Sequence, residues 1–174
     1  MFDEPLPRQA DLRKLAAAHA RFDVTMSIKH LPRFAGAVVG EDAAVRAQLQ
    51  FAIDDQYRKI ITGAVSCDTQ VVCQRCMEPV AILVSAGINL AVACDEERAR
   101  NLPNSMEPLI VAEDELLDLN EVLEDELLLA LPFVSYHQPD QCSGRQRYES
   151  TLGEQPVVEK ENPFSVLEQL KSGK

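Results

Sequence analysis

The sequence predicts an α+β fold, a small antiparallel β-sheet or open barrel of about five strands with a packed C-terminal helix and a flexible tail. Apolar residues alternate with polar ones on both sides of a short polar link at residues 73–79, which is typical of two half-buried strands joined as a hairpin. Residues 22–28 and 45–53 alternate in the same way. An amphipathic helical pattern then covers residues 118–131 and ends at Pro132.

The part of the chain before the hairpin predicts one helix, two strands and a loop. Residues 8–21 are rich in alanine and favour a helix, so residues 1–21 form an N-terminal helical segment. Residues 30–40 contain one proline and two glycines and predict a turn of helix and a loop. We also expect a β-bulge near Gly63, where the chain enters the hairpin.

The main α+β domain is expected to span residues 22–142. Its second hairpin strand ends near Cys94, which we expect, like Cys67, to be a core residue because it lies on the apolar face of its strand. Residues 109–112 predict a short edge strand. In the following helix, Asp118 is expected to be the N-cap, with Glu121 three residues further on.

Residues 143–174 predict a polar linker followed by a short C-terminal helix. Asn162 and Pro163 form a good helix start, and Phe164, Leu167 and Leu170 then share one face. This helix either packs back on its own domain or binds a partner as a docking peptide.

The composition is that of a soluble globular protein, with 46% apolar and 26% charged residues among 174. No apolar run approaches the roughly 18–20 residues of a membrane span, and the N-terminus lacks the pattern of a secretory signal. Five cysteines in a chain without an export signal indicate the reducing cytoplasm. We therefore expect a cytoplasmic protein with no membrane partner and no disulfides.

The net charge of −11 is concentrated in the second part of the chain. Residues 1–59 contain nine Lys and Arg against eight Asp and Glu, whereas residues 60–174 contain eight against twenty. An acidic surface repels phosphate, so we expect no DNA partner and no broad RNA-binding face. Any RNA contact should be indirect or local, and the N-terminal third of the chain is the first place to expect a local contact. Alternatively, the acidic residues only keep the protein soluble.

A C-x-x-C pair, Cys73 and Cys76, lies at the tip of the predicted hairpin and could form half of a zinc site. His137 and Cys142 are the other His and Cys residues that lie close together in the chain, so the predicted ligand set is Cys3His around one structural zinc. Two alternatives remain open, a metal-free pair that only turns the hairpin and a redox-active thiol pair. The redox reading is less favoured because no obvious helix begins at Cys73 to lower the pKa of a thiol.

Candidate partner-binding residues lie in an acidic run, at the hairpin tip and in the C-terminal helix. Arg75, at the tip, could contact a phosphate or an acidic partner. None of the usual catalytic or nucleotide-binding motifs occurs, so the sequence does not indicate an enzyme. The candidates in full are Arg75, Glu113, Asp114, Glu115, Glu121, Glu124, Asp125, Phe164, Leu167 and Leu170.

Five motifs in order give the chain a family resemblance. They are V-C-Q-R-C-M-E-P at 72–79, S-M-E-P-L-I-V at 105–111, L-D-L-N-E-V-L-E-D-E-L-L-L-A-L-P at 117–132, H-Q-P-D-Q-C at 137–142 and N-P-F-S-V-L-E-Q-L-K at 162–171. With these motifs the chain resembles the proteobacterial form of the YceD family, the large ribosomal RNA subunit accumulation proteins. The resemblance covers about residues 20–174. Some relatives carry further cysteines after the A-L-P segment, where this chain has His137 and Cys142.

The resemblance implies a cytoplasmic ribosome biogenesis factor needed for synthesis, processing or stability, and hence accumulation, of 23S rRNA. It implies no catalytic residues. Combined with the charge, it indicates binding to a large-subunit ribosome precursor through a basic ribosomal protein or an assembly factor. One alternative is an acidic chaperone for a basic large-subunit ribosomal protein, and a second is an RNA-processing enzyme with an unrecognised site.

Overall fold

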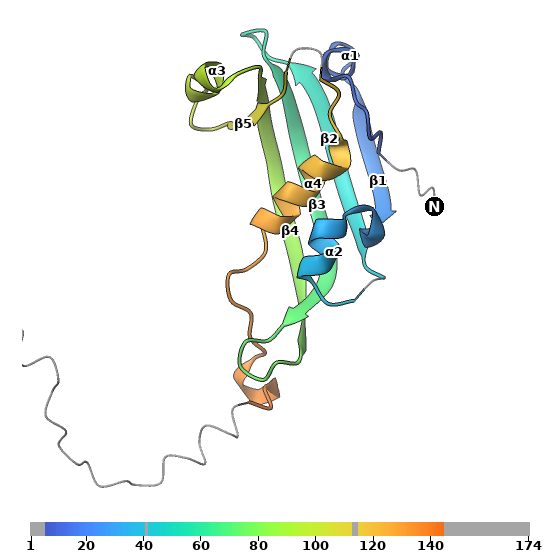
Figure 1. The fold of residues 1–174 in the computed structure, drawn as a ribbon, viewed down its shortest axis with the longest axis vertical. Helices are drawn as coiled ribbons and strands as arrows, with labels where there is room; N and C mark the ends of the chain where they lie inside the picture. Colours follow the sequence, from blue (N-terminus) through green and yellow to red (C-terminus); the bar gives the residue numbers. More distant parts are fainter. Residues whose placement is uncertain (1–5, 41, 113–114, 145–174) are drawn as a thin grey trace, which may run out of the picture.

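The computed structural model describes residues 6–40, 42–112 and 115–144, and its centre is one open five-stranded sheet (Figure 1). The strand order across the sheet follows the chain, from β1 to β5. The strands are β1 Arg21–Ser27, β2 Ala44–Ile53, β3 Lys59–Val72, β4 Pro79–Ala93 and β5 Glu107–Ile110. The α+β class predicted from the sequence is confirmed, and the sheet is open rather than closed into a barrel.

The first four strands are antiparallel, but β5 pairs parallel to β4, so the sheet is mixed. The reason lies in residues 94–106, which contain the short helix α3 (Glu96–Arg100) and a proline-containing loop. The chain leaves β4 at Ala93 and re-enters the sheet beside Leu90, so β5 pairs with the last residues of β4. A parallel pair needs a connection of roughly a dozen residues, which this segment supplies. The edge strand expected at residues 109–112 begins two residues earlier, at Glu107.

The helices of the described residues lie mainly on one face of the sheet, where α2 and α4 lie side by side (Figure 1). They are α1 Leu12–Ala17, the 3-10 turn η1 Ile28–His30, α2 Pro32–Ala37, α3, α4 Leu119–Leu129 and the 3-10 turn η2 Pro139–Gln141. The predicted N-cap of α4 is confirmed, because the Asp118 carboxylate accepts the Asn120 backbone N–H at 2.9 Å. Helix α1 is shorter than the predicted 8–21 segment because Asp11 caps its start and β1 already begins at Arg21. None of these helices is long and apolar enough to span a membrane.

The hydrophobic core lies between the sheet and α4. Leu119, Leu123 and Leu127 of α4 are fully buried against sheet residues such as Phe51 and Val65. Cys67 is 0% exposed, as expected for a core residue. Cys94 is only half-buried, contrary to expectation, because it follows the last residue of β4, where its thiol contacts the Asp95 carboxylate.

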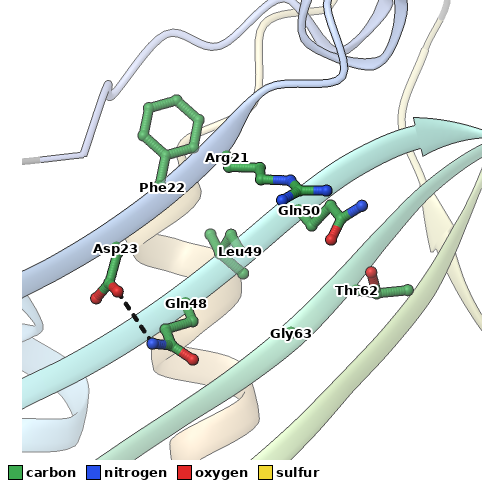
Figure 2. A pocket seen from close by; sticks show the side chains of 8 residues that line it. All are labelled: Arg21, Phe22, Asp23, Gln48, Leu49, Gln50, Thr62 and Gly63. Carbon is green, nitrogen blue, oxygen red and sulfur yellow. Dashed lines mark hydrogen bonds between the residues drawn. The ribbon is translucent and has the colours of Figure 1, made fainter.

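Gly63 lies at a crowded point of the sheet, between β2 and β4. The strand register runs without interruption through Gly63, so the expected bulge is absent. Its φ is +157°, and an added Cβ would overlap the backbone carbonyl of Gln48. Figure 2 shows Gly63 beside Gln48, in a shallow hollow on the sheet face opposite α4 where Gln48 donates to Asp23 at 3.0 Å.

We predict that Gly63→Ala lowers the free energy of unfolding by about 3 kcal/mol, because strands β2 and β3 would have to separate locally. Urea unfolding of the two proteins measures the difference. Gly87→Ala on β4 is the matched control, since an added Cβ there has no neighbour within 4 Å and should change stability by only about 0.5 kcal/mol. Equal urea midpoints for the two variants would refute the steric argument.

Candidate metal centre

Two segments far apart in the sequence meet at one end of the molecule, where the β3–β4 turn lies against the segment that follows α4 (Figure 1). The four residues predicted as metal ligands lie there together. The Sγ atoms of Cys73, Cys76 and Cys142 and a ring nitrogen of His137 all lie within 4.8 Å of one another. Cys76 Sγ lies 3.3 Å from His137 Nδ1, and Cys73 Sγ lies 4.0 Å from Cys142 Sγ.

The β3–β4 turn, residues 73–78, presents its two thiols to the same side through a tight backbone geometry. The Cys73 backbone N–H donates to the Glu78 carbonyl at 2.9 Å, and the Met77 N–H donates to the Cys73 carbonyl at 2.9 Å. Met77 adopts a left-handed φ of 63°, which closes the turn. Arg75, between the two cysteines, remains exposed at the tip.

The second half of the cluster is held against this turn by backbone hydrogen bonds. The Gln74 N–H donates to the Ser135 carbonyl at 2.9 Å, which places His137 beside Cys76. The 3-10 turn η2 then reverses the chain, so that Cys142 returns to Cys73 and is 6% exposed. The local geometry thus explains how an H-x4-C segment can complete a C-x-x-C pair.

The orientation of the His137 ring suits a metal ligand. Its Nε2 lies 3.0 Å from the carbonyl oxygen of Pro79, which can only accept a hydrogen bond. Nε2 therefore carries a proton, and in the neutral ring Nδ1 presents its lone pair to the thiols. A histidine that ligates a metal through one ring nitrogen typically donates from the other to a carbonyl or carboxylate in this way.

The electrostatics of the turn favour a thiolate at Cys73. Burial alone would raise the pKa of the Cys73 thiol, but hydrogen bonds from the backbone N–H groups of Cys76, His137 and Arg75 outweigh it and lower the pKa to about 5. In return, the hydrogen bond to Cys73 raises the pKa of His137, with further contributions from Cys76 and the Pro79 carbonyl. Since the thiolate is the form of cysteine that binds metals, the turn is prepared for a cation.

The donor set and its spacing fit a tetrahedral metal ion such as zinc. With Zn–S bonds of about 2.3 Å, tetrahedral sulfur ligands lie roughly 3.8 Å apart, close to the separations found here. Three thiols and one imidazole fill all four positions, as in structural zinc sites, so no position would remain for a reactive water. The arrangement can therefore join the turn to the segment after α4, and it offers no obvious catalytic chemistry.

The acidic residues predicted to bind a partner lie in different local environments. Glu121 and Asp125 lie on the exposed side of α4, and Asp125 pairs with Arg33 at 2.8 Å. Glu115 is also exposed, and its carboxylate accepts the Ala112 N–H at 3.1 Å. Glu113 and Asp114, like Phe164, Leu167 and Leu170, lie outside the described residues.

The expectation that Glu124 belongs to the exposed acidic surface is wrong. Its side chain is buried, with the residue 3% exposed, and its carboxylate accepts the backbone N–H groups of Arg33 and Phe34 and the Arg33 Nε–H. These backbone donors belong to the first turn of α2, which has no side-chain cap of its own. Glu124 therefore holds α2 to α4 and is not available to a partner.

Arg75 has an aromatic neighbour, Tyr136, that is not among the residues predicted from the sequence. Its guanidinium lies over the ring of Tyr136, 5.1 Å from the ring centroid. Tyr136 belongs to a short aromatic segment, Phe133–Val134–Ser135–Tyr136, directly after Pro132. A sequence signal was present, because Tyr136 directly precedes His137, which the predicted ligand set places at the hairpin tip.

The fold and the cluster define a small α+β protein with a Cys3His knuckle. Comparison with known proteins then identifies the family: the family model of the large ribosomal RNA subunit accumulation protein YceD matches residues 61–171, and the chain belongs to this family. It is 32% identical over 168 residues to the large ribosomal RNA subunit accumulation protein YceD of Haemophilus influenzae, covering 95% of this chain and 96% of the relative. No solved structure matches the chain.

Proposed function

We propose that this protein supports the accumulation of large-subunit ribosomal RNA in the bacterial cytoplasm and that it acts by binding rather than by catalysis. The observation that carries the proposal is the match over nearly the whole length to a relative named for that role. The four-donor cluster supports the second part, because it has the composition of a structural site.

We propose further that the cluster holds one structural zinc ion. Cys73, Cys76, His137 and Cys142 would be its ligands, and the hydrogen bond from His137 to the Pro79 carbonyl would orient the imidazole. When bound, the ion would supply a cross-link between the β3–β4 turn and the segment after α4.

The partner that fits the surface best is a basic protein of the large-subunit precursor. The chain carries a net charge of −11, and Glu115, Glu121 and Asp125 are exposed near and along α4. Complementary charge accelerates such an encounter, and this attraction weakens as the salt concentration rises. RNA contact would then be indirect or local. The charge equally supports a second candidate, a chaperone that holds a free basic ribosomal protein before it joins the particle.

Sedimentation tests the proposal and gives our second prediction. In a low-salt gradient the wild-type chain should travel with large-subunit precursors, and high salt should release it. A Glu115→Gln, Glu121→Gln double variant should bind roughly fivefold more weakly, because it removes two exposed charges and retains side-chain acceptors.

The matched control is Asp55→Asn, Glu97→Gln, which removes the same charge from exposed positions at the β2–β3 turn and on α3. If this control weakens binding equally, only net charge matters and the α4 surface is not the binding site. If the wild-type chain remains with the free proteins at low salt, the chaperone candidate replaces direct assembly.

A further inference from the structure

Four large apolar side chains around the β3–β4 turn face solvent. Phe133 is 98% exposed, Met77 72%, Tyr136 49% and Val134 48%. Together with Arg75 we call these residues the knuckle patch. Neither the predicted zinc site nor the acidic surface of α4 accounts for their exposure.

The patch is one surface, although its members come from two segments. The backbone of Gln74 is hydrogen-bonded to Ser135, and the Gln74 side-chain amide donates to the Phe133 carbonyl at 3.4 Å. Arg75 lies over Tyr136. In Figure 1 the chain descends from α4 along the β3–β4 turn, so both segments form the same end of the molecule. The ligand cluster takes two residues from each segment and would fix the two segments relative to each other.

Met77 provides an independent argument that the patch is functional. A left-handed φ of 63° is unfavourable for any residue with a Cβ and is easily adopted by glycine. The Met77 side chain contributes little to the core, because 72% of the residue remains exposed. The chain therefore holds an apolar side chain on the surface at a conformational cost, as is common at binding sites.

We propose that the knuckle patch is the docking site for an apolar anchor of the basic ribosomal protein that this chain binds; this inference rests on the proposed function. Aromatic residues, Met and Arg are the side chains enriched at the centres of protein interfaces. Exposed apolar clusters on a soluble protein commonly mark such interfaces. The anchor would supply apolar contacts at this end, and the acidic residues along α4 would attract the basic surroundings of the anchor.

The charges near the patch favour a protein over RNA and over a second copy. Among the described residues of these two segments, 73–78 and 133–144, Arg75 is the one Arg or Lys, and the exposed carboxylates of Glu78 and Asp140 lie in the same segments. One arginine among carboxylates is a poor match for a phosphate backbone, which is bound through several cations. Two copies of a chain of charge −11 repel each other, whereas a basic protein is attracted.

The test uses the full-length chain with three substitutions. Met77→Gly and Phe133→Ser each remove an apolar side chain from the patch. Tyr57→Gly is the matched control, because Tyr57 is 90% exposed and has a φ of 61°, but lies in the β2–β3 turn at the other end of β3. The probes are individually purified bacterial large-subunit ribosomal proteins and, separately, protein-free 23S rRNA, titrated against labelled chain by fluorescence anisotropy.

We expect at least one basic ribosomal protein to bind the wild-type chain, with affinity reduced at least roughly tenfold by Met77→Gly or Phe133→Ser and unchanged by Tyr57→Gly. The melting temperature of Met77→Gly should equal or exceed that of wild type, because the substitution relieves the left-handed residue. Its metal content should also match wild type. If Met77 had only a structural role, its substitution would not weaken binding while stability and metal content stayed undiminished.

The contrary outcomes separate the two proposals. If the patch variants bind as wild type while Glu115→Gln, Glu121→Gln weakens binding, the docking site is wrong and the proposed function stands. If no ribosomal protein binds, the proposed basic protein partner fails, and the docking site with it. Binding to 23S rRNA alone, or a wild-type dimer that Phe133→Ser dissociates, would overturn the protein anchor in favour of RNA or a second copy.

Discussion

A Cys73→Ser variant is expected to lose its metal, from about one zinc ion per chain in wild type to a small fraction of that, and to release residues 133–144 from the hairpin tip. Cys73 is 0% exposed and faces Cys142, so serine would leave an unfilled ligand position in the middle of the cluster. Plasma mass spectrometry of protein purified without chelators measures the metal. Limited proteolysis with mass mapping should show cleavage within residues 133–144 that is roughly tenfold faster than in wild type.

The sheet should remain folded in this variant, because the core formed by α4 and the sheet does not include Cys73 or Cys142. Chelation of wild-type protein should reproduce the same local release. Cys94→Ser is the control, since Cys94 lies outside the cluster and its replacement should leave the metal in place. Wild-type protein with far less than one zinc ion would refute the metal site itself, whereas full zinc in Cys73→Ser would refute only the ligand assignment.

Features of the structure that depend on neighbouring residues in the chain could be predicted from the sequence. Apolar alternation on both sides of residues 73–79 predicted β3 and β4, and the Asp118 cap predicted the start of α4. The C-x-x-C spacing likewise indicated half of a ligand set. In each case the signal is a pattern of residues within one strand, one turn or one helix.

Features that depend on contacts between distant segments could not be predicted in the same way. The predicted ligand set brings His137 to the hairpin tip, but it does not show that the Tyr136 ring lies under Arg75. No local pattern sends β5 into the sheet parallel to β4. Glu124 is the clearest case, because it lies in an acidic run that suggests a solvated face. Only the position of α2 against α4 shows that this one carboxylate points inward.

That arrangement leads to a large expected effect: Glu124→Ala should lower the free energy of unfolding by about 3 kcal/mol. The Glu124 carboxylate accepts the Phe34 N–H at 3.0 Å and the Arg33 Nε–H at 2.8 Å, in addition to the Arg33 backbone N–H. Alanine would leave the backbone donors of the first turn of α2 unsatisfied in a buried place. It would also remove a negative charge from the positive end of that helix.

Two further substitutions separate the cap from the ion pair, with urea unfolding as the measurement. Glu124→Gln keeps an oxygen that can accept a backbone N–H, so it should cost about half as much as alanine. Asp125→Asn removes the other carboxylate that pairs with Arg33, but from the exposed side of α4, and should change stability little. If Asp125→Asn were as damaging as Glu124→Ala, the stabilisation would come from the charge of Arg33. The connection between α2 and α4 would then not depend on a buried cap.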